Sequence, residues 1–263
     1  MIDDLTPITR EWNEKTNKIT IYGVGDIHIG SAEFDEKAWN KKSEKILADD
    51  SAYIAIVGDL IDNGLKNSKT NVYAETMRPD TQIETAIEYL RPLRDRIICI
   101  VPGNHENRSR RECDINPAYV ISAALGIDDL YRENLAIMIL KFGETQFKRG
   151  QKNTYGGIAY HGSSRNKIQK FNLSFDNISF AISGHTHQGY MENSGRISVN
   201  LKAGTAKHVP FRNLVIDSNL GPGGYGLEKN YPITTPANIL SGIVLNKIGH
   251  DKNKTIDTVS ITV

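Results

Sequence analysis

The sequence has few cysteines and no long apolar run. It contains two cysteines, too few for a disulfide framework, and Cys99 lies in the apolar stretch Ile97–Val101, where a buried, unreactive thiol is expected. No stretch approaches the length of a membrane span, and Met1–Leu5 lacks the basic opening and apolar core of a signal peptide. We therefore expect a soluble, cytoplasmic protein of a reducing compartment that does not enter a membrane.

The sequence also lacks an excess of charge of either sign. Its 32 Lys and Arg residues and 31 Asp and Glu residues give a formal net charge of +1. Proteins that bind nucleic acid through non-specific phosphate contacts usually carry a clear basic excess. Local basic residues remain, and they keep open the alternative of a non-catalytic nucleic-acid-binding module. They are Arg108, Arg110, Arg111, Arg165, Lys167 and Lys170.

Hydrophobic residues make up 39% of the 263 residues, enough for a sizeable core, and we expect a single domain over residues 1–263 without internal repeats. Residues 1–18 are polar and predict a loose arm or an edge hairpin. Strand and helix patterns alternate in the first half, and short strands dominate the second. This order favours an α/β protein in which two mixed sheets pack face to face with helices outside.

Hydrophobic periodicity gives the expected elements. The strands are Ile19–Val24, Tyr53–Val57, Ile97–Pro102, Leu135–Phe142, Thr145–Lys148, Gly157–Tyr160, Ile178–Ile182, Ile197–Leu201, Ile239–Asn246 and Thr255–Val263. The helices are Asp35–Leu47 with Asp35 as N-cap, Thr81–Leu93, and one that Asn116 and Pro117 open and Gly126 ends. Residues 65–80 form a long polar loop, either functional or disordered, and Gly221–Gly226 is a surface loop by composition.

Polar side chains follow five of these strands at the point where each strand ends. The five strand ends are Gly25–His28, Gly58–Asp62, Gly103–Glu106, Tyr160–Gly162 and Gly184–His187. A single Gly-Asp pair after a strand is more often a plain turn. In open α/β sheets, however, ligands bind at the carboxyl ends of the strands, so five such ends predict one shared crevice.

The residue types at these strand ends are those that borderline divalent metals accept. They offer carboxylate oxygen, imidazole nitrogen and amide oxygen, and no thiolate. Five of the seven histidines lie there, together with Asp26, Asp59 and Asn104. A buried core alone does not explain such a concentration, so the sequence predicts a metal site.

The five blocks resemble the signature of the calcineurin-like metallophosphoesterases, which is Asp-x-His, Gly-Asp-x-x-Asp, Gly-Asn-His-Asp/Glu, a lone His and Gly-His-x-His. Every block is present and in order between residue 19 and about residue 208. The resemblance implies a four-layer αββα fold and two divalent metal ions, Mn²⁺ first, with Fe, Zn, Ni or Mg as alternatives. It implies that one metal is held by Asp26, His28 and His187, the other by Asn104, His161 and His185, and both by the bridging Asp59.

The resemblance also implies the chemistry. A hydroxide between the metals would attack the phosphorus of a phosphate ester, with no covalent enzyme intermediate. His105 is similar to the family's proton donor to the leaving oxygen, and Asp62 to the carboxylate that orients it.

Two positions bear on the substrate. Protein phosphatases of the family carry Arg after the second Asp and Gly after the first His, where this sequence has Asn63 and Ile29. The block Asp26–Gly30 looks more like the phosphodiesterase and DNA-repair nuclease branch. We therefore expect hydrolysis of a phosphodiester in DNA or a nucleotide. The alternative is a phosphomonoesterase or protein phosphatase of the same fold.

Three arginines follow the third strand end and would bind a flanking phosphate of a longer substrate. They are Arg108, Arg110 and Arg111. The sequence leaves the oligomeric state open.

Overall fold

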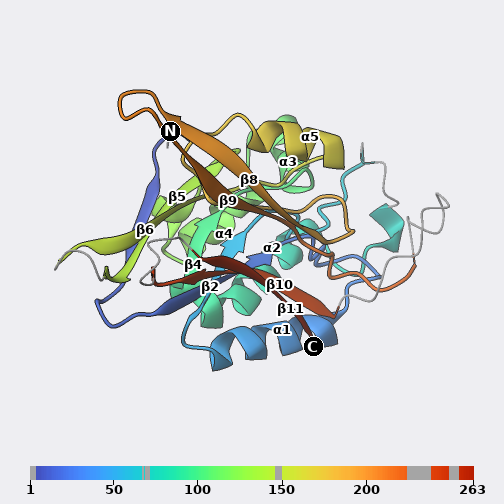
Figure 1. The fold of residues 1–263 in the computed structure, drawn as a ribbon. Coiled ribbons are helices and arrows are strands. Elements are labelled where there is room, and N and C mark those ends of the chain that lie inside the picture. The colour runs from blue at the N-terminus through green and yellow to red at the C-terminus, as the bar shows by residue number, and fades with distance from the viewer. Residues whose placement is uncertain (1–3, 67, 69–71, 146–149, 224–237, 249–254) are drawn as a thin grey trace.

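A computed structural model describes residues 4–66, 68, 72–145, 150–223, 238–248 and 255–263. Two mixed sheets stack face to face, with helices on the outer faces (Figure 1). The expected α/β sandwich with flanking helices is therefore confirmed. No helix in these ranges is both long and apolar enough to span a membrane.

The first sheet has five strands in the order β11-β10-β2-β3-β4. Their bounds are β2 Lys18–Val24, β3 Ala52–Ile56, β4 Ile97–Ile100, β10 Ile239–Asn246 and β11 Ile256–Thr262. Strands β2, β3 and β4 are parallel, so their carboxyl ends lie at one edge. These three strands are buried on both faces, which is why their sequences are continuous apolar runs.

The second sheet has six strands in the order β1-β5-β6-β7-β9-β8. Their bounds are β1 Ile8–Glu11, β5 Ala136–Glu144, β6 Lys152–Ala159, β7 Phe180–Ser183, β8 Tyr190–Asn200 and β9 Thr205–Val215. Strands β6, β7 and β9 are parallel, and β8 returns antiparallel to β9. The carboxyl ends of β6 and β7 therefore lie at one edge of this sheet too.

The main core fills the space between the two sheets. Ile19 and Ile21 of β2 pack there against residues that include Phe142 and Phe180 of the six-stranded sheet, and each of the four is fully buried. Cys99 lies in the same layer, and burial raises the pKa of its thiol to about 12. The expected burial of Cys99 is confirmed, and a raised pKa is consistent with an unreactive thiol.

Helices cover the outer faces. The outer face of the five-stranded sheet packs against α1 (Glu36–Ala48), α2 (Pro79–Leu90) and α4 (Pro117–Ala124). The outer face of the six-stranded sheet packs against α5 (Arg165–Asn172) through Ile168. Two expected caps are present: Asp35 Oδ1 accepts from Ala38 N at 2.9 Å, and Asn116 Oδ1 from Ala118 N at 3.0 Å.

Several expected boundaries differ from the structure. The second helix ends at Leu90, and a 3₁₀ turn, η2 (Arg91–Arg96), covers the remainder. Within residues 1–18, Ile8–Glu11 is an edge strand parallel to β5, not a hairpin. Helices α3 (Glu106–Cys113) and α5 and strand β9 were not expected at all. Residues 146–148 of the strand expected over Thr145–Lys148 and residues 224–226 of the loop expected over Gly221–Gly226 lie outside the described residues.

Candidate metal centre

The five polar strand ends meet at the shared edge of the two sheets. Within two groups, one ligand atom from each member lies within 4.8 Å of those of all the others. The first group is Asp26, His28, Asp59 and His187, and the second is Asp59, His161 and His185. Asp59 belongs to both groups, and Asn104 Oδ1 lies 2.9 Å from His161 Nε2 and 2.8 Å from His185 Nδ1. The convergence expected from the sequence is present for all seven candidate ligands.

The backbone at these strand ends is left-handed. Eight described residues other than glycine have a positive φ, and six of them lie at the strand ends or directly after one. The six are Asp26, His28, Asp59, Asn63, His185 and His187, with φ between 46° and 73°. Such conformations are unfavourable for residues with a Cβ and cluster at functional sites. The chain here is held by its surroundings in a shape it would not adopt alone.

Two glycines allow the β3 and β4 ends to touch. A Cβ on Gly103 would lie 2.0 Å from Asp59 Oδ1, and a Cβ on Gly58 would lie 2.2 Å from Gly103 N. Gly58 also has a φ of 86°. A side chain at Gly103 would therefore collide with Asp59, and one at Gly58 would force the two strand ends apart.

Glu106 fixes the position of Asp59 from below. Its buried carboxylate accepts hydrogen bonds from the backbone N–H groups of Asp59, Leu60 and Gly103 at 2.9, 2.7 and 2.8 Å, and from Ile61 at 3.3 Å. One side chain thus joins the ends of β3 and β4. In the sequence, Glu106 stands out only as part of a motif, because nothing in the chain order reveals which backbone groups it reaches.

In the first group, three potential ligand atoms converge. His28 Nδ1 lies 3.3 Å from Asp62 Oδ1 and donates to it, which leaves Nε2 as the ring nitrogen that a metal can bind. That nitrogen faces His187 Nε2 at 3.1 Å. Asp26 Oδ1 is buried, has no hydrogen-bond partner among the described residues, and lies 3.9 Å from His187 Nε2. A dication fits this donor set because it would satisfy the orphaned oxygen and both nitrogens.

The second group has the same character. His161 Nδ1 donates to the Val57 carbonyl oxygen at 2.8 Å, which leaves Nε2 as the ring nitrogen that a metal can bind once its proton is released. Nε2 faces Asn104 Oδ1 at 2.9 Å, His185 Nδ1 at 3.1 Å and Asp59 Oδ2 at 3.3 Å. The residues present therefore fit a second cation as well.

In the protein without metal, protons bound to side chains of the centre balance part of its charge. Burial and the neighbouring Asp59 raise the pKa of Asp26 to about 7, against the opposing effect of His161. Burial lowers the pKa of His161, but Asp59 outweighs it and raises that pKa to about 10. Burial and then His28 lower the pKa of His187 to about 3, so this imidazole is neutral, the form that binds metals. Metal binding should therefore release protons from the centre.

His105 and Asp62 lie beside the first group. His105 Nδ1 is 2.6 Å from the Asp62 carbonyl oxygen and 3.2 Å from Asp62 Oδ1. Burial favours a protonated Asp62, but hydrogen bonds from His105 and His28 outweigh it and hold the pKa of this carboxyl well below its usual range. Asp62 thus orients His28 as well as His105, a second contact that the sequence analysis did not anticipate.

The three candidate arginines of α3 separate in space. Arg108 reaches the centre, with Nη2 2.9 Å from His105 Nε2. Arg110 forms an ion pair with Glu133, and Arg111 is exposed. Only Arg108 of the three contacts a candidate site residue.

Asn63 is buried and does not face a substrate. Its Nδ2 donates to the His105 carbonyl oxygen at 2.6 Å and to Ser109 Oγ at 2.9 Å. Its backbone N–H donates to Gln82 Oε1 at 2.8 Å, and Gln82 Nε2 donates to Glu75 Oε2 at 2.7 Å. Glu75, in the described part of the polar 65–80 loop, is therefore tied to the rim of the centre.

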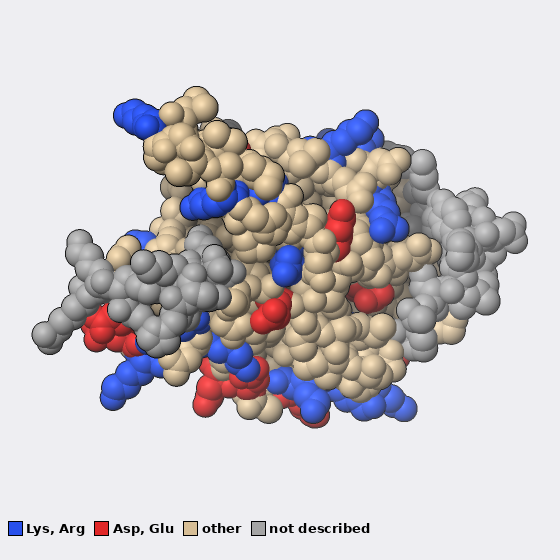
Figure 2. Space-filling view, in the orientation of Figure 1, with Lys and Arg blue, Asp and Glu red and all other residues tan. Residues whose placement is uncertain are grey.

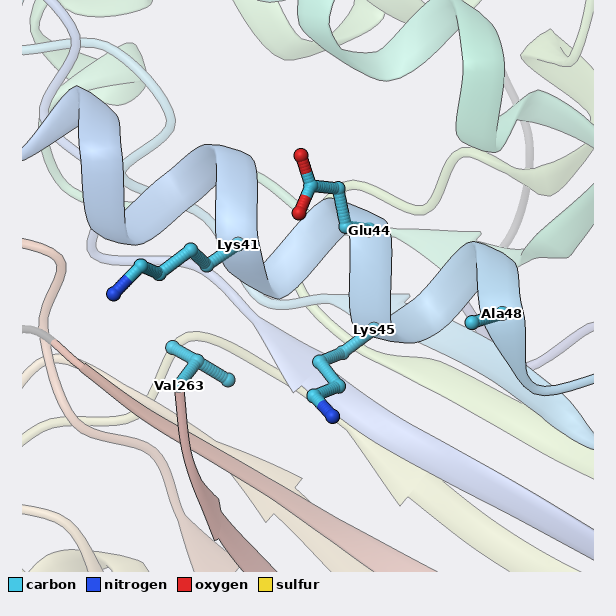
Figure 3. Close-up of a pocket in the computed structure, with 5 residues that line it drawn as sticks. All are labelled: Lys41, Glu44, Lys45, Ala48 and Val263. Atoms are coloured by element: carbon cyan, nitrogen blue, oxygen red, sulfur yellow. The ribbon is translucent and has the colours of Figure 1, made fainter.

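The face in Figure 2 and the hollow in Figure 3 point to no binding site beyond the candidate metal centre. On the face in Figure 2, basic and acidic side chains are interspersed, most densely along the lower edge near α1, which agrees with a net charge of +1. A hollow of ≈ 280 Å³ lies between α1 and Val263 (Figure 3). Lys41 and Lys45 extend on the side of Val263, whereas Glu44 points the other way. No candidate ligand lines this hollow.

Comparison with known proteins is consistent with the motifs. The model of the calcineurin-like phosphoesterase family matches residues 19–189, and among curated proteins none matches. The structure resembles a conserved protein of Streptococcus pneumoniae described as a predicted phosphoesterase, with 14% identity over 94% of this chain and 99% of that one, at a TM-score of 0.39. A metallophosphoesterase of Sphaerobacter thermophilus has 13% identity, with 92% and 88% covered, at a TM-score of 0.37.

GAP50, the anchor in the inner membrane complex of Plasmodium, has 12% identity to this chain. The match covers 94% of this chain and 85% of that one, at a TM-score of 0.47. At such identities and TM-scores, none of these similarities bears on the substrate.

Proposed function

This chain belongs to the calcineurin-like phosphoesterase family, and we propose that it is a phosphodiesterase that uses two divalent metal ions. The family makes it a phosphoester hydrolase with a site for divalent metal. The proposal of two metals has one main support. Asp59 is shared between two groups of converging ligand atoms, as a carboxylate bridging two cations would be.

The residues divide between the metals as follows in this proposal. Asp26, His28 and His187 hold the first, Asn104, His161 and His185 hold the second, and Asp59 holds both. When bound, the pair supplies a nucleophile from water at neutral pH and withdraws charge from the phosphoryl oxygens. Mn²⁺ is our first choice, with Fe, Zn, Ni or Mg as alternatives, because a donor set of oxygen and imidazole nitrogen without thiolate accepts each of these metals.

The protein's own groups complete the chemistry. His105 donates a proton to the leaving oxygen, and Asp62 holds the His105 ring through Nδ1. Asp62 also holds His28, so the same carboxylate fixes a candidate ligand and the proton donor relative to each other.

The diester preference draws on the position after Asp62. Asn63 is fully buried and uses its side chain within the protein, so it adds no cation for a dianionic monoester. Arg108, Arg110 and Arg111 contribute to phosphate binding in this proposal, the last two only on a substrate long enough to reach them. Nucleic acid or a nucleotide is the substrate class with such flanking phosphates.

A substrate screen tests the proposal. Manganese-loaded protein is assayed on an aryl phosphomonoester, an aryl phosphodiester, cyclic nucleotides, and single- and double-stranded DNA. We expect diesters to be hydrolysed faster than the monoester, and chelator to abolish the activity. Much faster monoester hydrolysis would contradict the diester preference and favour a phosphomonoesterase of the same fold.

A further inference from the structure

The Arg108 guanidinium covers the ring nitrogen through which His105 would donate a proton. Arg108 Nη2 is 2.9 Å from His105 Nε2, and Arg108 Nη1 donates to the Asp62 carbonyl oxygen at 2.8 Å. A guanidinium only donates hydrogen bonds, so Nε2 is the acceptor here. His105 Nδ1 faces the same carbonyl oxygen at 2.6 Å and must donate. One tautomer of His105 satisfies every one of these contacts.

This arrangement leaves His105 with no free ring nitrogen. Nδ1 is held by Asp62, and Nε2 is held by Arg108. A leaving-group oxygen needs to come within about 2.6 to 3.2 Å of the donating nitrogen. It cannot do so at Nε2 while Arg108 occupies that position, so Arg108 must move before His105 can act.

The other contacts of Arg108 are weak enough to be exchanged. Besides His105, its hydrogen-bond partners among the described residues are two neutral carbonyl oxygens, those of Asp62 and Asn63. Glu75 lies near enough to respond to its charge, but forms no ion pair with it among the described contacts. Hydrogen bonds from arginine to phosphate join two opposite charges and can be bidentate, whereas those to a carbonyl oxygen or a neutral imidazole join a charge to a neutral group. A phosphate in the centre should therefore draw Arg108 away.

We propose that Arg108 is a cap on His105 that phosphate displaces. A phosphate ester entering the centre takes the guanidinium, and this movement uncovers Nε2. The freed Nε2 then takes up a proton from solvent water and passes it to the leaving oxygen, so that His105 returns to the tautomer it had before. The inference rests on the proposed function, in which His105 is the proton donor. It gives Arg108 a role beyond anion binding, because proton donation becomes available only when a phosphate is bound.

The first test measures how accessible His105 is. Diethyl pyrocarbonate modifies an uncovered imidazole nitrogen, and peptide mass spectrometry gives the rate at His105. In the manganese-loaded protein, Arg108→Met should be modified about tenfold faster than the wild type, the equivalent of one lost hydrogen bond. Arg91→Met is the matched control, because Arg91 is an exposed arginine of η2 outside the centre, and it should not change the rate.

The second test measures phosphate binding to the same proteins by calorimetry, with inorganic phosphate as the probe. Arg108→Met should weaken the affinity about 10- to 100-fold, since it removes a charge-assisted contact. Arg108→Lys should weaken it less, because lysine keeps the charge but loses the planar fork. Arg91→Met should bind phosphate as the wild type does.

Equal modification rates in the wild type and Arg108→Met would show that Arg108 does not cover His105. Equal phosphate affinities would show that phosphate does not bind Arg108 and so does not displace it. If Arg108→Met does not fold, the same two comparisons with Arg108→Lys decide. A wild-type protein that hydrolyses no phosphate ester would instead refute the proposed function, and the modification test, which needs no turnover, would still judge the cap.

Discussion

The two sheets contribute unlike halves to the candidate centre. The five-stranded sheet supplies the carboxylates Asp26 and Asp59, which are 0% and 1% exposed. The six-stranded sheet supplies only histidines, of which His185 is exposed and the His187 side chain is 34% exposed. Asp26 and Asp59 therefore form a buried floor of the centre, and His185 and His187 form its more exposed opening.

Hydrogen bonds from backbone amides hold the two carboxylates of the floor in place. Asp59 Oδ1 accepts from His105 N at 2.9 Å, and Asp26 Oδ2 accepts from His185 N at 2.8 Å. Glu106 binds four further amides beneath them. A buried carboxylate that is satisfied in this way cannot turn without leaving donors unpaired. Substitutions at the floor should therefore reduce metal binding and turnover more than substitutions at the opening.

The largest effect is expected at Asp59. Asp59→Asn removes the one anion shared by both groups, so both metals should be lost and turnover should fall to the uncatalysed background. Metal analysis after manganese loading and desalting measures the stoichiometry. Undiminished metal content and activity would refute the bridging role.

His185→Ala, at the opening, is the matched comparison for Asp59→Asn. It removes a ligand of one group only, so one metal per chain should remain. Loss of both metals from His185→Ala would mean that the opening matters as much for metal binding as the floor.

His105→Ala should separate metal binding from chemistry. Both metals should stay, while turnover falls by roughly 10² to 10⁴ on substrates with poor leaving groups. Nitrophenyl substrates should suffer less, because their leaving oxygen needs no proton. Equal losses on nitrophenyl and alkyl substrates would remove His105 from the proton-donor role.

Glu106→Gln tests the floor itself. The amide of Gln has an NH₂ group that cannot accept from the backbone donors, so the Asp59 segment should loosen. We expect metal affinity to fall about 10- to 100-fold, with a lower Tm, whereas Glu112→Gln, at an exposed position of α3, should change neither. Calorimetry and thermal unfolding give both values, and wild-type behaviour of Glu106→Gln would show that Asp59 is held by other contacts.

The smallest effect is expected outside the centre. Arg110→Ala and Arg111→Ala should raise KM on an oligonucleotide by a few-fold, roughly the value of one exposed charge contact, and leave a small aryl diester nearly unaffected. Steady-state kinetics on both substrates measures this. Similar changes on both substrates would mean that these arginines act on the centre, not on flanking phosphate.

The candidate ligands could be predicted because their signals are local. Each lies directly after a buried apolar strand, and parallel strands must end at one edge. Helix α3 gave no such signal: its Arg-rich sequence has no apolar period, and Glu106 is its only buried residue. Its place is set by contacts to distant residues, such as Asn63 with Ser109.

Strand β9 was missed for a related reason. Lys207, His208 and Pro210 interrupt the alternation typical of a strand, and the segment is strand because it pairs with β7 and β8. Likewise, the sequence suggested Arg108 as a phosphate ligand but not its contact with His105, which depends on the arginine's rotamer. Pairings and rotamers set by distant partners leave no trace in local spacing.

The left-handed backbone at the strand ends has a consequence for how such a site persists. Each residue with a Cβ held in this region costs on the order of 1 kcal/mol, which glycine would relieve. His185→Gly, at an exposed position, should therefore raise the Tm of the chelator-treated protein while removing a metal ligand, and a lower Tm would contradict this reading. Selection for heat resistance alone would tend to erase the centre one residue at a time, so its survival in a lineage would itself record a continuing demand for its chemistry.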